Sequence, residues 1–236
     1  MPTIEQARNW YPADPVHGFD HVLRVYHLAE QLARQEGADV EIVRAAALLH
    51  DVESGQLSAV SFQHKADELS NDLSEVNGKQ ENNPAKRKDH HLCAAEFAVE
   101  VLRSEGWDEI RISAVCHCIR THRFRDAREA PQTLEAQILF DADKLDAIGA
   151  TGVARAIAYA TQAGMPAYAK PSAQFIATGK KEPDEPHSAY HEYLFKLIKI
   201  KDRLYTSAGR RMAEERHRFM CAYFKRLAQE CDQPQL

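Results

Sequence analysis

The sequence lacks an excess of positive charge, and this absence argues against one large class of partners. Its 236 residues include 30 lysines and arginines against 35 aspartates and glutamates, so the formal net charge is -5. The isoelectric point is correspondingly near 6.2. Proteins that bind the phosphate backbone of DNA or RNA usually present a basic field or patch. We therefore expect no nucleic-acid partner.

Long apolar runs are also missing. No stretch approaches the roughly 18 consecutive apolar residues that a membrane-spanning helix requires, and the chain does not open with a basic-then-apolar signal pattern. The 5 cysteines are odd in number and form no CxxC motif, a pattern typical of reduced thiols rather than of a disulfide framework or a zinc knuckle. We expect a cytoplasmic protein without a membrane partner.

Strand-type alternation of apolar and polar residues is absent over any useful length, and so are internal repeats. Apolar residues instead recur at helical spacing, and 44% of the chain is apolar, which suffices for a substantial core. We therefore predict an all-α fold in a single domain over residues 1–236. Within it we expect a polar loop at about 53–89, a surface loop at 164–187, and two closing helices at about 188–206 and 209–231.

The 12 histidines are the compositional oddity, and one of them stands in the pair His50-Asp51 after the apolar stretch 43–49. A helix that is apolar on one face should bury that face, where an unpaired imidazole or carboxylate is costly. A divalent cation offers both groups a partner. Adjacent helical residues point about 100° apart, so the pair can converge on one ion only near a helix end. We expect residues 52–55 to supply that end. The alternative is an ordinary polar pair at a helix end.

Two further positions have the same character. His21 lies four residues before Val25, at the buried edge of its predicted helix, and His17 is one turn earlier. Asp141 interrupts an apolar stripe, between Ile138 and Leu145, which indicates a cationic partner for its carboxylate. Two imidazoles and two carboxylates, with water completing the shell, suit Mn²⁺, Fe²⁺, Mg²⁺, Co²⁺ or Ni²⁺ better than a closed structural zinc site.

The order of these positions resembles the motif H…HD…D of the HD superfamily of metal-dependent phosphohydrolases, in particular its small bacterial hydrolases. The resemblance implies an all-helical HD-domain bundle, one divalent metal ion between the helices, and hydrolysis of a phosphate ester or anhydride, usually of a nucleotide, by metal-activated water. It assigns as metal ligands His21, His50, Asp51 and Asp141. It rests on the blocks HGFDHVLRVYHLAEQLA, ALLHDV, AVCHCIRTHRFR, LEAQILFDADKLDAIGATGVARA and HEYLFKLIKIKDRLYTSAGRRMAEER.

Three residues near these ligands are candidates for assisting the reaction. Glu53, two residues after the His-Asp pair, is a candidate base or water ligand, or else a surface carboxylate. Lys144 follows the last predicted ligand by about one turn and either holds a phosphate or forms a salt bridge to Asp143 or Asp20. Arg24 stands in the same relation to the first ligand.

Two alternatives remain open. Some HD-fold proteins use two additional histidines to hold a second metal ion, and a few of those are di-iron oxygenases while others are phosphodiesterases. His117 together with His90 or His91 would be the extra ligands here, unless these residues are a helix-start pair and a core histidine. The second alternative is a nucleotide-sensing HD domain without activity, although the presence of all four ligands argues against it. The amphipathic C-terminal helices are also suited to a homodimer.

Overall fold

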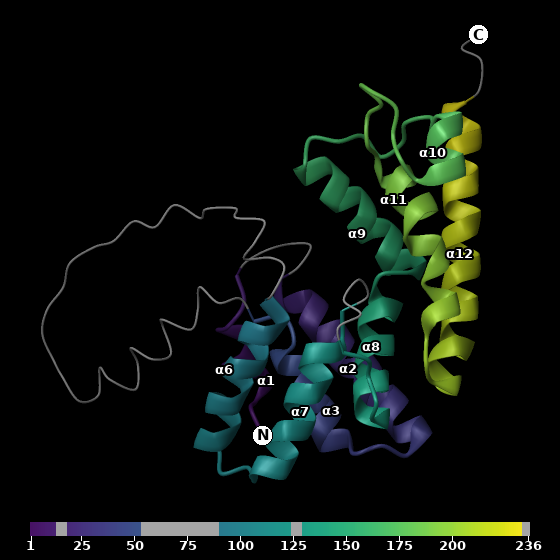
Figure 1. Ribbon diagram of the computed structural model, residues 1–236. Helices are drawn as coiled ribbons and strands as arrows, with labels where there is room; N and C mark the ends of the chain where they lie inside the picture. The colour runs from purple at the N-terminus through teal and green to yellow at the C-terminus, as the bar shows by residue number, and fades with distance from the viewer. Residues whose placement is uncertain (13–17, 53–89, 124–128, 233–236) are drawn as a thin grey trace, which may run out of the picture.

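The computed structural model describes residues 1–12, 18–52, 90–123 and 129–232. These ranges contain helices and no β-strand (Figure 1). The all-α prediction is therefore confirmed. No helix in the described ranges is both long and apolar enough to cross a membrane. The α-helices are α1 (Ile4–Arg8), α2 (Phe19–Glu36), α3 (Val40–Leu49), α6 (His90–Ser104), α7 (Glu109–Thr121), α8 (Leu134–Asp146), α9 (Gly149–Gln162), α10 (Ala173–Thr178), α11 (Ala189–Phe195) and α12 (Ser207–Cys231).

The connection between α2 and α3 follows directly from the sequence. Gly37 ends α2 in the left-handed conformation, with φ of 77°, which glycine adopts at little cost. Asp39 then caps α3, because its carboxylate accepts hydrogen bonds from the amides of Glu41 at 2.9 Å and Ile42 at 3.2 Å. The short connection makes the two helices packed neighbours, with the His-Asp pair at the far end of α3.

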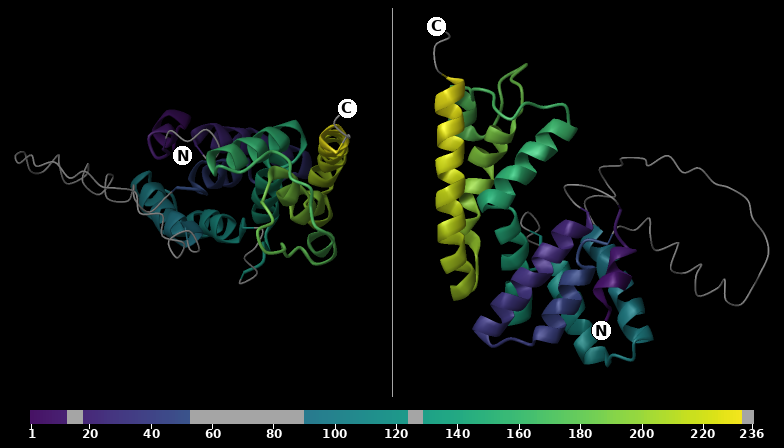
Figure 2. Two further views of the ribbon diagram at one scale, coloured as in Figure 1. Left: turned by 90° about the horizontal axis from the view of Figure 1, so that it is seen from above. Right: turned by 180° about the vertical axis from the view of Figure 1, so that it is seen from behind.

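The helices form two groups that α8 and α12 join. Between α2, α3, α7 and α8 lies a buried apolar core whose largest members include Leu32, Leu48, Ile119 and Leu139. Helix α6 packs on α7, whereas α9, α11 and α12 form the second group. The long α12 lies along one side of the molecule and contacts α9, α8 and α2 (Figures 1 and 2).

The C-terminal segments depart from our expectation in two places. The first closing helix is not continuous over 188–206: α11 ends at Phe195, and two 3-10 turns, Leu197–Lys199 and Lys201–Arg203, lead to an extended Leu204. The expected surface loop at 164–187 contains the short helix α10. The predicted loop at about 53–89 lies outside the described residues.

One carboxylate ties the segment between α9 and α11 to the rest of the second group. Glu185 accepts hydrogen bonds from the Ser172 amide at 2.7 Å, the Ser172 hydroxyl at 2.8 Å and the Glu182 amide at 2.7 Å. Its other contact is Nε2 of the buried His191, at 3.1 Å. Desolvation opposes ionisation of Glu185, but these donors outweigh it and lower its pKa to about 2.

Because the pKa of Glu185 is lower in the folded chain than in the unfolded chain, its contribution to stability is present above its ordinary pKa and is lost as the pH falls toward 2. We expect Glu185→Gln to lower the thermal midpoint at pH 7, and the gap to the parent protein to close on acidification. Thermal unfolding across this pH range measures the gap. Glu182→Gln, a change at an exposed neighbour, should leave the midpoint almost unchanged, and an equal gap at every pH would contradict the assignment.

Candidate metal centre

The pair His50-Asp51 lies at the end of α3, where two adjacent side chains can point toward the same ion. Helix α3 stops at Leu49, and His50 is its C-cap residue. The buried His50 ring places Nδ1 2.8 Å from the Ala47 carbonyl oxygen. A carbonyl only accepts, so Nδ1 carries the proton and Nε2 holds a lone pair in the neutral ring. Burial lowers the pKa of His50 to about 4, so this ring is neutral at pH 7.

His21 lies in the first turn of α2 and is held from behind by a buried carboxylate. Its Nδ1 is 2.7 Å from Oδ2 of Asp146 on α8, which orients Nε2 toward His50 and Asp51. Asp146 is also paired with two arginines, through Arg24 Nε and Arg155 Nη1, each at 2.7 Å. Burial opposes its ionisation, but the His21 and arginine contacts outweigh burial and lower the pKa of Asp146 to about 2.

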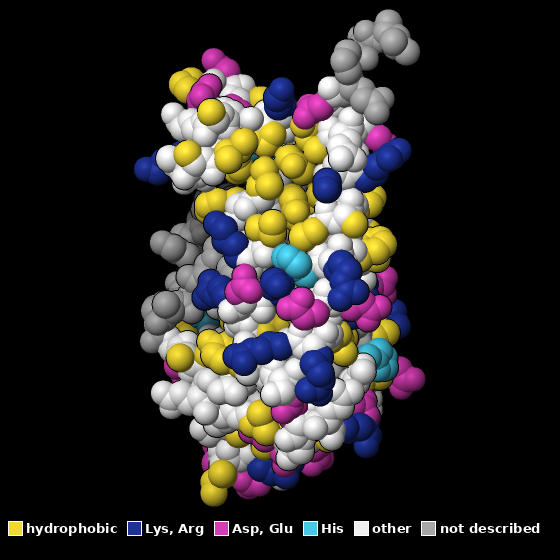
Figure 3. All heavy atoms as spheres, turned by 90° about the vertical axis from the view of Figure 1, so that its right-hand side faces the viewer, with side chains coloured by type: hydrophobic (Ala, Val, Ile, Leu, Met, Phe, Trp, Pro, Cys, Tyr) yellow, Lys and Arg dark blue, Asp and Glu magenta, His cyan; other side chains and the backbone are white. Residues whose placement is uncertain are grey.

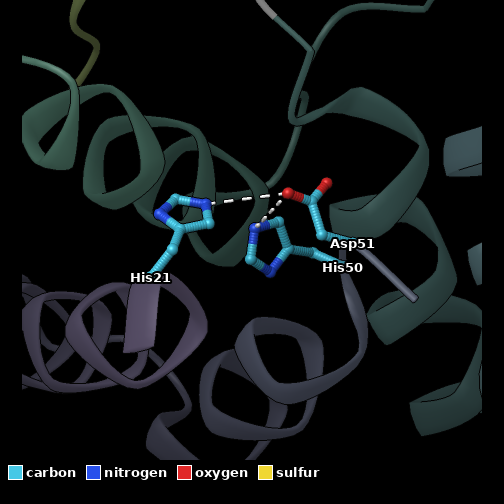
Figure 4. Close-up of side chains that lie close together, drawn as sticks. All are labelled: His21, His50 and Asp51. Atoms are coloured by element: carbon cyan, nitrogen blue, oxygen red, sulfur yellow. Dashed lines mark ion pairs between the residues drawn. The ribbon is translucent and has the colours of Figure 1, made fainter. Parts of the chain in front are cut away.

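The carboxylate of Asp51 is the meeting point of the two rings. Its Oδ2 lies 3.6 Å from Nε2 of His21 and 3.6 Å from Nε2 of His50 (Figure 4). Burial alone would raise the pKa of Asp51, but the neighbouring histidines reverse the shift and hold it well below its ordinary value. The side chain is 22% exposed, so this cluster of an anion and two imidazoles is not sealed from solvent.

The second oxygen of Asp51 has two further imidazoles beside it. Oδ1 is 3.1 Å from Nε2 of His90, the first residue of α6, and 3.5 Å from Nε2 of His122, the C-cap residue of α7. His122 has the same arrangement as His50, since its Nδ1 lies 2.6 Å from the Ile119 carbonyl oxygen and its Nε2 points into the cluster. Among the described residues, Asp51 thus belongs to two groups with metal-ligand spacing, one with His21 and His50 and one with His90 and His122.

Our assignment of Asp141 as the last ligand does not agree with the geometry. Its carboxylate points toward the start of α12, where it accepts hydrogen bonds from the amides of Tyr205 at 2.9 Å and Thr206 at 2.8 Å and from the Thr206 hydroxyl at 2.7 Å. Asp143, two residues later, faces the cluster instead, with Oδ1 3.5 Å from Nε2 of His21. Residues two apart on a helix point to different sides, so only one of the two aspartates can face His21.

The candidate assisting residues have partners of their own. Lys144 forms an ion pair with the neighbouring Asp143, which is the alternative that the sequence left open, and its ammonium lies 5.4 Å from the centre of the Phe140 ring. Arg24 is bound to Asp146, with its side chain 39% exposed. Both cations therefore lie beside carboxylates of the centre. Glu53 lies outside the described residues, so its role stays a prediction.

The remaining predicted histidines divide differently from our expectation. His117 does not reach the centre: its Nδ1 is 2.7 Å from Glu129, and its Nε2 accepts a hydrogen bond from the Gln132 amide at 3.1 Å. His91 is buried but belongs to neither group. His17 lies outside the described residues. His122, which sequence reasoning missed, occupies the place in the second group that we had assigned to His117.

The donor set matches a divalent metal ion. Nε2 of His50 is buried and has no hydrogen-bond partner among the described residues, although an unsatisfied buried nitrogen is unfavourable. Nδ1 of His21, His50 and His122 each faces an oxygen acceptor, which is the arrangement that aims Nε2 at a metal. Imidazole nitrogens with carboxylate oxygens suit Mn, Fe, Co, Ni or Zn, and a set without thiolates does not favour a structural zinc site.

The bundle and this cluster define a helical protein with a centre of histidines and aspartates suited to a divalent metal, and comparison with known proteins gives the family. A model described as the HD domain matches residues 18–148. The chain is also 30% identical over 235 residues to the uncharacterized protein YpgQ of Bacillus subtilis (strain 168), covering 96% of this chain and 92% of the relative. The chain belongs to the HD domain family.

Solved structures agree along the whole length. The crystal structure of Bacillus subtilis YpgQ in complex with ADP matches with a TM-score of 0.64 at 26% identity, covering 98% of each chain. An HD-superfamily hydrolase from Bacillus thuringiensis matches with a TM-score of 0.59 at 25% identity, covering 98% of this chain and 97% of that one. The similarity to HD-superfamily hydrolases therefore includes helices α9–α12, beyond the residues that the family model matches.

Proposed function

We propose that the protein is a divalent-metal-dependent phosphohydrolase that cleaves a phosphate ester or anhydride of a nucleotide. The observation that carries the proposal is the convergence of two buried imidazoles on one carboxylate oxygen, that of Asp51, with Asp143 beside them. The proposed ligands are His21, His50, Asp51 and Asp143. A metal ion in this position supplies Lewis acidity toward a phosphoryl oxygen and toward the attacking water.

The nucleotide substrate is supported by a relative and by the chemistry of the site. The relative YpgQ has been crystallised in complex with ADP. In this chain, Lys144 and Arg24 are cations beside the proposed ligands, each paired with a carboxylate. We propose that both orient phosphate oxygens through charge-assisted hydrogen bonds, and that Glu53 holds or deprotonates the attacking water. The partial exposure of Asp51 and Asp143, 22% and 15%, leaves the centre open to a substrate.

The alternative of two metal ions keeps specific support, with different ligands from those we expected. His90 and His122 form a second group on the other oxygen of Asp51. A second ion there would share Asp51 with the first, as in two-metal sites where ions about 3.5–4 Å apart hold both the attacking and the leaving oxygen. This arrangement favours two-metal phosphodiester or phosphate chemistry. Two bound irons would favour an oxygenase instead.

We also propose that the chain acts as one unit rather than as separable halves. Helix α12 packs against α2, α8 and α9, and the Asp141 carboxylate binds its N-cap residue, Thr206. A homodimer remains a proposal for the side of α12 where Phe219 and Tyr223 are exposed.

The decisive test combines metal content with activity. We expect protein purified without chelators to contain about one divalent ion per chain, or about two if the His90 and His122 group is filled. A nucleotide panel that includes ADP, assayed for released phosphate and pyrophosphate, should show metal-dependent turnover. Asp51→Ala should lose both metal and turnover, because it removes the carboxylate that both groups share.

The control is His117→Ala, which changes a histidine outside both groups and should keep metal and activity. Loss of the second ion alone in His122→Ala would establish the two-metal form. Metal binding without turnover of any phosphate compound would support a nucleotide-sensing domain, and no metal under any loading condition would refute the proposal.

A further inference from the structure

The second group of helices contains a cleft that the proposed reaction does not use. It has a volume of about 500 Å³ and lies between the segment after α9, α10, α11 and the C-terminal end of α12. The lining residues begin at Tyr168, so all of them lie beyond the family match at 18–148. In Figure 3, apolar side chains gather over the upper half of this face, at the end of the molecule away from α2 and α3 (Figures 1 and 3).

The cleft is lined by aromatic rings and two lysines. Tyr168 and Tyr190 pack together, with ring centres 5.0 Å apart. Phe195 is 44% exposed, and Lys199 holds its ammonium 5.2 Å from the Phe195 ring centre. Large apolar side chains at a concave surface are the usual lining of small-molecule sites, whose volumes run from about 300 to 1,000 Å³. The remaining lysine of the lining is Lys170, on the segment after α9.

The shape is preorganised by contacts that leave little freedom. Gly179 ends α10 with φ of 71°, and a Cβ there would come within 2.7 Å of the Phe195 ring, so the ring lies against bare backbone. Glu185, through the four contacts described above, holds the segment before α11. Behind the cleft, Tyr193 stacks on Phe224 with centres 4.5 Å apart. A site that is already formed binds without the entropy loss of ordering its walls.

The charged residues of the lining favour an anionic ligand. Neither Lys170 nor Lys199 forms an ion pair with the described residues. The lining also includes Asp232, and burial together with that carboxylate raises the pKa of Tyr168, so its phenol stays neutral. A symmetric contact of two chains through this cleft would bring the same lysines together, which disfavours a second copy as the occupant.

We propose that this cleft binds a small planar aromatic anion, whose ring lies among Tyr168, Tyr190 and Phe195 and whose sulfonate, carboxylate or phosphate group pairs with Lys170 or Lys199. The aromatic walls supply apolar area and ring stacking, and each lysine supplies a charge contact. The proposal is independent of the metal centre, because no proposed metal ligand lines the cleft.

The test uses two matched fluorescent probes on the full-length protein, with sedimentation velocity to follow the oligomeric state. The anionic probe is anilinonaphthalene sulfonate, and the neutral probe is N-phenylnaphthylamine. We expect saturable binding of one anionic probe per chain. Lys170→Glu combined with Lys199→Glu should weaken binding of the anionic probe by about tenfold, since a favourable charge contact is lost and two unfavourable charges replace the lysines. The neutral probe should bind as before.

Two further variants separate the cleft from general apolar surface. Arg218→Glu combined with Lys225→Glu makes the same charge change on exposed residues that do not line the cleft, and should leave both probes unaffected. Ala228→Trp places an indole in the lining and should abolish both, with thermal unfolding as the check on folding.

If both double variants weaken binding of the anionic probe equally, the proposal is refuted, because the effect would then come from the net charge of the protein and not from the cleft. Probe binding that survives a folded Ala228→Trp variant would also refute it. So would a dimer that this substitution dissociates, since a second copy would then fill the cleft. Displacement of the bound dye by adenosine monophosphate would identify the anion as a nucleotide, and displacement by indole carboxylate alone would identify an aromatic acid.

Discussion

Asp143→Asn is expected to lower metal affinity and phosphate release by at least about a hundredfold, because loss of a second-shell partner alone costs about 10–100-fold and this change removes a proposed ligand. Asp141→Asn is expected to keep both. The prediction follows from the placement of the two carboxylates: Asp143 faces Nε2 of His21, whereas Asp141 faces the start of α12. Elemental analysis of metal per chain and turnover of the same nucleotide measure the two effects.

The two substitutions should differ in their effects on the free energy of unfolding. The Asp141 carboxylate accepts three hydrogen bonds in the interior, and an amide in its place directs an N–H group at some of those donors. Hydrogen bonds to a charged group contribute about 1.5–3 kcal/mol each, so Asp141→Asn should lower the free energy of unfolding by a few kcal/mol. Asp143→Asn without metal should change it less, since its carboxylate is partly exposed. The reverse pattern, with metal lost from Asp141→Asn only, would restore the sequence-based ligand assignment.

The stretch DADKLD, residues 141–146, shows what helical periodicity predicts and what it leaves open. The apolar stripe through Asp141 was read correctly as a buried face, and its carboxylate is buried as expected. The stripe does not say which element each of its positions meets, and Asp141 meets the start of α12, 64 residues later in the chain. The three aspartates serve three partners, since Asp141 binds the start of α12, Asp143 faces the cluster, and Asp146 supports His21.

The His-Asp pair was predictable for a local reason. A polar pair after an apolar helix can converge only where the helix stops, and α3 stops at Leu49. His122 is in the same local situation at the end of α7, and this repeated helix-end position was the signal for it. Choosing His117 by its place on the helix face overlooked that a residue one turn inside α7 points to Glu129 instead.

The C-terminal helices were predictable in approximate extent but not in number or form, since neither α10 nor the break after α11 was expected. The break after α11 brings the backbone amides of Tyr205 and Thr206 against Asp141, and the approach is close, since a Cβ at Gly209 would lie 2.5 Å from the Asp141 carboxylate. Helical periodicity continues through this region and gives no sign of the break. The cleft beside α10 was not predictable for the same reason, because tertiary contacts bring its walls together and helical periodicity does not report those contacts.

Asp146→Asn is expected to weaken metal binding by about 10–100-fold although this residue is not itself a proposed ligand, because second-shell partners of ligating histidines have effects of this size. Asp146 fixes Nδ1 of His21 and so directs Nε2 toward Asp51. An amide can present its N–H₂ group to Nδ1 and favour the wrong tautomer. Metal titration of chelator-treated protein, monitored by calorimetry, gives the affinity.

The effect on metal must be separated from loss of stability, because Asp146 is also a buried partner of two arginines. Breaking a buried ion pair destabilises by about 3–5 kcal/mol, so both Asp146→Asn and Arg155→Met should unfold at lower denaturant concentration. Only the first removes the acceptor of His21, and only the first should change metal affinity. If Arg155→Met weakens metal binding equally at matched stability, Asp146 acts by holding α8 in place rather than by orienting His21. The two variants share the lost Arg155 ion pair, whereas only Asp146→Asn also changes the contacts to His21 and Arg24.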